Sequence, residues 1–142
     1  MSRLIIPIAA LLSLGLAAPA FAAMEKFAAT LDTASEVPAK TGPGMGDVQA
    51  TLDTATKQMT YTVTFSGLSG PATAAHFHGP ADKAANASPV VPFPAPVASP
   101  YHGSAVLTDA QIADLEAGKW YVNVHTAANP GGEIRGQVAK GK

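Results

Sequence analysis

The sequence predicts an all-β domain, an antiparallel Greek-key sandwich or barrel that carries one short helix. Apolar and polar residues alternate with a period of two in several segments, which is typical of strands with one buried face. The 142 residues include 13 glycines and 12 prolines, a turn-rich composition that suits β-sheets better than a helical bundle. Helix-start signals occur at one place, so we expect a single helix between strands.

The clearest predicted strand covers residues 58–65, where Met59, Tyr61 and Val63 share one face and threonines occupy the other. Such a strand buries its apolar face and leaves the threonines in water. Because six prolines fall between positions 80 and 100, most of that stretch is expected to be an extended surface loop. Further strands are predicted at 27–31, 48–52, 74–78, 120–125 and 134–138, with a short edge strand at 90–93.

The predicted helix covers residues 109–117. Thr108 and Gln111 have the spacing of a capping box, in which the threonine caps the first turn and the glutamine side chain reaches back. Gly118 follows the helix and is a natural terminator. The helix is therefore expected to run for about two turns between two strands.

Charge and cysteine content exclude several classes of function. The formal net charge is −1, without a basic stripe, which argues against nucleic-acid binding through phosphate contacts. The absence of cysteine excludes disulfides, thiolate metal sites and a cysteine nucleophile. Zinc-protease, nucleophile-elbow and phosphate-loop motifs are also absent, so the sequence predicts no catalytic residue.

Residues 1–22 are predicted to be a secretory signal peptide. Arg3 gives a positive start, residues 4–16 are almost entirely apolar, and residues 20–22 read Ala-Phe-Ala, a small-x-small cleavage signal. The apolar run is short for a transmembrane helix, although an uncleaved anchor is the alternative. We therefore expect residues 23–142 to form one β domain, exported to the periplasm or the extracellular space and free of the membrane after cleavage.

Three of the four histidines are predicted to face the same way. His76 and His78 lie two residues apart, so on a strand they share a face, while Phe77 points into the core. If the apolar residues of 120–125 also point inward, His125 points outward like the pair. Three neutral imidazoles on one face suit Cu(II), or Zn(II) in its absence. The alternative is that all three are ordinary polar surface residues.

Neighbours of the histidines follow from the pairing of the last two strands. If both strands bury their apolar faces, His125 lies opposite Glu133 and Asn123 lies opposite Arg135, or a two-residue shift brings Arg135 opposite His125. We therefore expect Glu133 or Arg135, with Asn123, to contact His125 and orient its ring without binding the metal themselves. His102, in a predicted loop, is a further candidate ligand.

Three segments together resemble the CHRD domain family, named after chordin. They read HFHGPA at 76–81, YVNVHT at 121–126 and NPGGEIRGQ at 129–137. The resemblance implies an exported β-sandwich domain without an established catalytic activity. A more distant similarity is to copper/zinc superoxide dismutase, whose fold places a His-x-His strand and a late strand histidine on the outside of a Greek-key barrel.

Three functions are compatible with these observations. The chain is an exported, non-enzymatic binding or structural module, a periplasmic copper or zinc protein that uses three histidines, or a redox enzyme resembling superoxide dismutase. Apart from a metal ion, no cofactor is expected. The sequence carries no signal that identifies a protein or carbohydrate partner.

Overall fold

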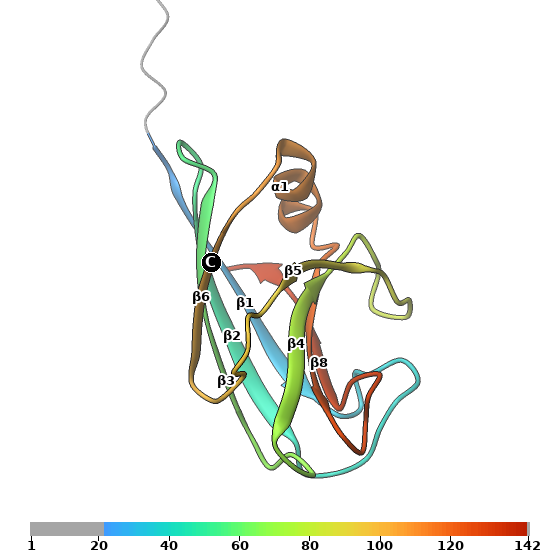
Figure 1. Ribbon diagram of the computed structural model, residues 1–142. Helices are drawn as coiled ribbons and strands as arrows, with labels where there is room; N and C mark the ends of the chain where they lie inside the picture. Colours follow the sequence, from blue (N-terminus) through green and yellow to red (C-terminus); the bar gives the residue numbers. More distant parts are fainter. Residues whose placement is uncertain (1–21, 142) are drawn as a thin grey trace, which may run out of the picture.

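The computed structural model describes residues 22–141, which form one folded unit of strands with a single short helix (Figure 1). The predicted signal peptide, apart from Ala22, lies outside the described residues. In chain order the elements are β1 (Met24–Asp32), β2 (Met45–Asp53), β3 (Gln58–Ser66), β4 (Ala72–His78), β5 (Pro89–Pro92), β6 (Tyr101–Val106), α1 (Asp109–Glu116), β7 (Tyr121–Thr126), β8 (Ile134–Gln137) and β9 (Ala139–Lys140).

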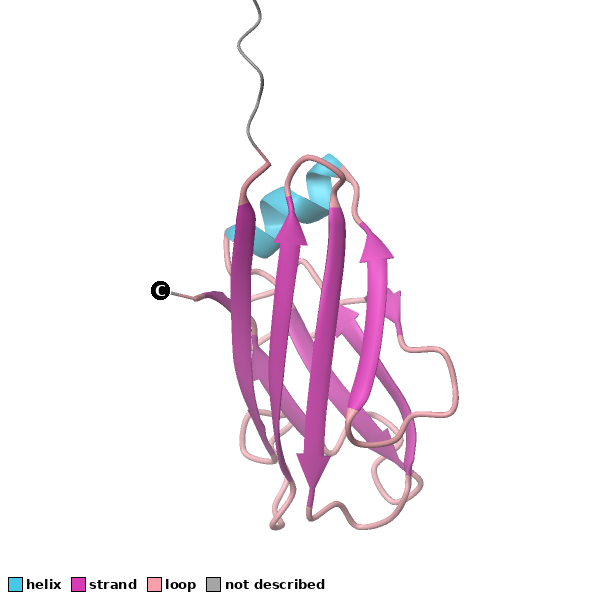
Figure 2. Ribbon diagram, turned by 90° about the vertical axis from the view of Figure 1, so that its left-hand side faces the viewer, coloured by secondary structure: helices cyan, strands magenta, loops and turns pink. Residues whose placement is uncertain are grey.

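The strands form one antiparallel sheet that folds over into two facing halves. The strand order is β5-β4-β7-β8-β1-β2-β3-β6, and β9 pairs with β1. The connections from β3 to β4, from β5 to β6 and from β6 to β7 cross between the halves, which gives Greek-key topology. Figure 2 shows the long strands of one half in front and the other half crossing behind them. The predicted fold class, an antiparallel Greek-key β domain with one helix, is confirmed.

The core lies between the two halves and consists of the alternate residues that the period-2 pattern selected. Met59, Tyr61 and Val63 of β3 are buried, while their threonine neighbours are exposed or half-buried. Trp120 and Val124 are fully buried on the opposing half. Near the open edge, Phe93 stacks on Tyr101 with ring centroids 4.8 Å apart, so the barrel is nearly closed between β5 and β6.

The helix α1 covers one end of the barrel, as Figures 1 and 2 show. Its capping box is present: the Thr108 hydroxyl accepts from the Gln111 amide at 3.2 Å, and the Gln111 side chain accepts from the Thr108 amide at 2.9 Å. Leu115 is the buried residue that anchors the helix. Among the described residues, no helix is long and apolar enough to cross a membrane.

Two strands were not predicted, β6 and the two-residue β9 that follows β8. Residues 101–106, expected to lie in a loop around His102, form β6 and pair with β3 from Val63↔Tyr101 to Gln58↔Val106. The alternation there is weak because its inward positions include Gly103, where a Cβ would overlap the ring of Tyr61. Glycine is uncommon inside strands, so a glycine that makes room for a neighbouring ring leads the sequence pattern to predict a loop.

Candidate metal centre

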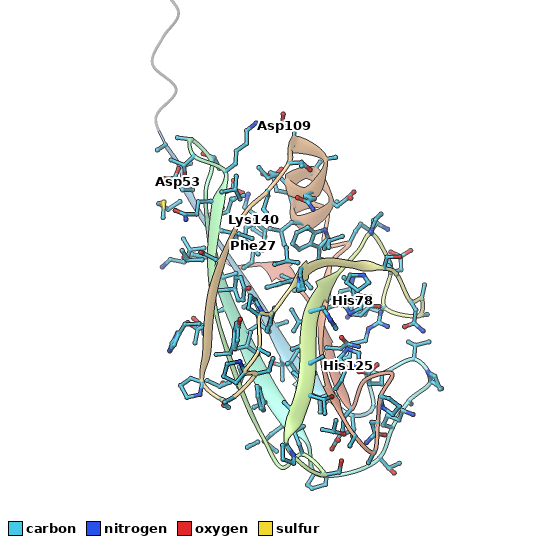
Figure 3. All side chains as sticks on the ribbon, viewed as in Figure 1. Phe27, Asp53, His78, Asp109, His125 and Lys140 are labelled. Carbon is cyan, nitrogen blue, oxygen red and sulfur yellow. The ribbon has the colours of Figure 1, made fainter. Side chains whose placement is uncertain are left out.

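Three histidines from two adjacent strands converge on one point. His76 and His78 lie on β4 and His125 on β7, and one nitrogen from each ring lies within 4.8 Å of the other two. The antiparallel register explains this meeting, because Ala74 pairs with His125 and His76 pairs with Asn123. In Figure 3, His78 and His125 lie on the side of β4 turned away from β1 and β2.

Two of the three rings already have the spacing of metal ligands. His76 Nδ1 and His125 Nε2 are 3.2 Å apart, and the ring centroids are 5.0 Å apart. Two nitrogens bound tetrahedrally at zinc–nitrogen distances of about 2.0–2.1 Å are separated by roughly 3.3 Å. The pair therefore needs little movement to share an ion, and the His78 ring, 5.3 Å from that of His76, must approach slightly.

Main-chain carbonyls determine which ring nitrogens of His78 and His125 carry protons. His78 Nδ1 is 2.8 Å from the Ala87 carbonyl oxygen, and His125 Nδ1 is 2.9 Å from the Pro130 carbonyl oxygen. A carbonyl only accepts, so in each ring Nδ1 is assigned as the donor. The neutral rings consequently present Nε2 lone pairs to the cluster, the arrangement found behind histidine metal ligands.

The Nε2 atom of His78 is buried and has no hydrogen-bond partner among the described residues. Buried ring nitrogens usually find a partner, so an unpaired lone pair needs an explanation. Here the lone pair belongs to a ring held by Ala87 and lies beside two other imidazoles. A cation at the cluster would satisfy it.

Asn123 is the buried amide that faces His125. Its Oδ1 lies 2.9 Å from His125 Nε2, and its Nδ2 donates to the Gly131 carbonyl oxygen at 3.4 Å. Both nitrogens of His125 therefore face oxygen acceptors, while a neutral ring has one proton to donate. A positive charge next to Nε2 relieves that mismatch, so the position predicted for Asn123 is electrostatically suited to a cation.

Two of the histidines favour the uncharged state. Burial lowers the pKa of His76, and the neighbouring His125 and His78 rings lower it further. Burial also lowers the pKa of His78, and it outweighs the opposing contributions of the Ala87 carbonyl and the Asn123 side chain. Uncharged imidazole is the form that binds metal, so the environment prepares both rings as ligands at neutral pH.

Of the two strand registers expected, the structure adopts the one that places Val124 opposite Ile134, whereas the Glu133 carboxylate forms no hydrogen bond with His125. Asn123 pairs with Arg135, as expected. The Glu133 carboxylate turns away from His125 and accepts from the Ser69 amide at 2.7 Å, the Ser69 hydroxyl at 2.6 Å and the Thr126 hydroxyl at 2.5 Å. The loop before β4 supplies the two Ser69 donors and the end of β7 supplies Thr126, and strand pairing alone does not reveal these contacts.

Arg135 contacts the ring of Tyr121 rather than His125. Its buried guanidinium donates to the Ala85 carbonyl oxygen at 2.7 Å and to the Asn86 side chain at 2.9 Å. The guanidinium carbon lies 3.5 Å from the centre of the Tyr121 ring. Tyr121 in turn stacks on His78, with centroids 4.7 Å apart and planes 4° apart.

His102, the further candidate ligand, does not join the cluster. It lies on the outer face of β6, in the other half of the sheet, where its Nδ1 is 3.0 Å from the Thr62 hydroxyl. Alternation along β6 explains the placement, because Tyr101 turns towards Phe93 and its neighbour must then turn outward. The three histidines that the structure brings together are therefore His76, His78 and His125.

Several groups around the site were missed by the sequence interpretation. The loop at 79–88 lies against His78, Tyr121 and Arg135 and supplies the Ala87 carbonyl. Tyr121 both stacks on His78 and bonds the Ala87 amide at 3.1 Å. Glu36 is a buried carboxyl group beside Asn123 and Gly132. Backbone carbonyls leave no residue signature, and Glu36 lies in a loop without a motif.

The fold and the histidine cluster define the class of this protein: an antiparallel Greek-key β domain with three convergent imidazoles on the outer face of one half. Comparison with protein families matches the CHRD domain over residues 27–138. The chain belongs to the CHRD domain family. Neither the curated proteins nor the solved structures give a significant match, so the similarity to copper/zinc superoxide dismutase stays a prediction.

Proposed function

We propose that this CHRD domain is an exported binding protein that holds a copper ion, or zinc in its absence, at His76, His78 and His125. One observation carries the proposal: the buried His78 Nε2 lacks a partner while Ala87 fixes the opposite nitrogen of the same ring. A surface histidine does not need this arrangement, whereas a ligand does. The role is binding rather than catalysis, in keeping with the non-enzymatic module expected from the family resemblance.

The donor set favours copper among the common ions. Imidazole nitrogen suits both copper and zinc, and divalent copper binds most nitrogen sites more tightly than zinc. Magnesium and calcium prefer oxygen ligands, and the cluster offers three nitrogens. Three protein ligands leave a coordination position for water or an external ligand.

Ion-dependent stability tests the proposal. An ion at 100 times its dissociation constant stabilises the folded state by about 2.7 kcal/mol, which raises the melting temperature. We expect Cu(II) to stabilise the wild-type protein, and His78→Ala and His125→Ala to lose most of that gain. His102→Ala is the matched control, because it removes an imidazole from the other half of the sheet. Equal stabilisation of all four proteins by copper would overturn the proposal.

A further inference from the structure

Arg135, Tyr121 and His78 form a three-layer stack behind the proposed metal site. The guanidinium carbon lies 3.5 Å from the centre of the tyrosine ring, and the tyrosine and imidazole centroids are 4.7 Å apart. The charged group is therefore within about 8 Å of a ring that supplies one of the ligand nitrogens. The planes of the Tyr121 and His78 rings are nearly parallel, 4° apart.

The positive charge of Arg135 is not cancelled by a contacting carboxylate. A guanidinium stays charged even when buried, and this one bonds the Asn86 side chain and the carbonyl oxygens of Asp82 and Ala85, all uncharged. The ion pairs within residues 22–141 involve lysines and not Arg135. Glu36 is a nearby carboxyl group: its burial raises its pKa while the positive charge of Arg135 lowers it, and no ion pair joins the two among residues 22–141.

We propose that Arg135 makes the three-histidine site selective for Cu(I) over Cu(II), an inference that rests on the metal-binding function proposed above. Three neutral imidazoles leave the full ionic charge on the metal. Repulsion from a fixed cation grows in proportion to that charge, so Cu(II) is penalised twice as much as Cu(I). An ion bound to Nε2 lies beyond the ring centre, at about 9 Å from the guanidinium, and at that separation in a partly buried site one unit of charge changes the affinity by roughly tenfold or more.

The number of ligands favours the same oxidation state. Cu(II) prefers a tetragonal set of nitrogen and oxygen ligands. The cluster formed by the described residues offers three nitrogens, from His76, His78 and His125, and His102 lies on the other half of the sheet. A trigonal nitrogen set satisfies a monovalent copper ion without further ligands, whereas Cu(II) must recruit them from solvent.

The test compares the dissociation constants of the two oxidation states in four proteins. Cu(I) is supplied as its acetonitrile complex without oxygen, Cu(II) as the sulfate, and each competes with a chelator of known affinity. The proteins are wild type, Arg135→Gln, Arg135→Lys and Asn86→Ala. Asn86→Ala is the matched control, because it removes one hydrogen bond of the guanidinium and keeps the charge.

We expect the wild-type protein to bind Cu(I) more tightly than Cu(II). Arg135→Gln should reduce that preference by about tenfold, and Arg135→Lys and Asn86→Ala should keep it within about threefold. A merely structural role of Arg135 would weaken both ions equally and leave the ratio unchanged, which overturns the inference. Tighter binding of Cu(II) by wild type overturns it as well, even if Arg135→Gln does not fold. Binding of neither ion would instead refute the metal function itself.

Discussion

His76 Nδ1 and His125 Nε2 lie 3.2 Å apart, although 49 residues separate the two histidines in the sequence. The contact exists because β4 and β7 are neighbours through the Greek-key crossovers, with His76 opposite Asn123. Sequence-local patterns select the outward face of each strand. The strand order then places the outward faces of β4 and β7 side by side, so that their histidines form one cluster.

The pH dependence of metal binding should follow the uncharged state of the buried rings. Burial lowers the pKa of both His76 and His78 from the ordinary value of about 6.5, so protons compete with metal at these rings only at lower pH. We expect copper affinity to change little between pH 8 and about 6.5 and to fall below it. Chelator competition at several pH values measures this, and a tenfold loss between pH 8 and 7 would contradict it.

Glu133 should stabilise the fold through its charge. Burial raises its pKa, but the hydrogen bonds from Ser69, Thr126 and Asn129 outweigh burial and lower it overall. A carboxyl group with a lowered folded-state pKa contributes stability that is fully present above its unfolded value of about 4.3 and is lost as pH falls through the lower folded-state value. Glu133→Gln should therefore cost about 1.5–3 kcal/mol at pH 7 and much less at pH 3.

Urea unfolding at the two pH values measures this difference. Glu116→Gln is the matched control, because Glu116 is exposed at the end of α1 and should change the free energy of unfolding by less than about 0.5 kcal/mol. An equal loss for Glu133→Gln at pH 7 and pH 3 would show that packing, and not charge, is what the residue contributes.

The residues that the sequence predicts best are those with a repeating pattern. Met59, Tyr61 and Val63 bury the face that alternation assigns to them, and Thr108 caps the helix as its spacing indicates. The outward direction of the histidine pair is predicted on the same grounds. Each of these features depends on residues close together in the chain, so a short window contains the whole signal.

What the sequence does not predict depends on contacts between distant loops. The Ala87 carbonyl orients His78, and Ser69 draws Glu133 away from His125, because the loops at 79–88 and before β4 fold against the site. Arg135 is paired as expected, but its guanidinium packs on Tyr121 and not on His125. Loop positions follow no period, so neither the cover over the site nor these partners could be derived from the pattern.

Gly103 should be intolerant of a side chain. A Cβ at this position of β6 would overlap the buried ring of Tyr61 in the facing strand. We expect Gly103→Ala to destabilise the protein by about 1–3 kcal/mol, because the ring must move within a packed core. Gly70→Ala is the control, since a Cβ there has no atom within 4 Å. Equal unfolding midpoints for the two variants would show that Tyr61 can move freely.

The hydroxyl group of Tyr121 should strengthen metal binding through the loop that holds His78. It accepts from the Ala87 amide at 3.1 Å and donates to the Ala87 carbonyl oxygen at 3.3 Å, the oxygen that also accepts from His78. Tyr121→Phe keeps the ring stacked on the imidazole but releases this peptide, so we expect copper affinity to fall about three- to tenfold. Tyr101→Phe is the matched control, because its hydroxyl bonds the Pro94 carbonyl oxygen in the other half of the barrel. Chelator competition measures the copper affinity of the wild type and the two variants. Unchanged affinity in Tyr121→Phe would mean that stacking alone orients His78. An equal loss of affinity in Tyr101→Phe would mean that the effect is general destabilisation.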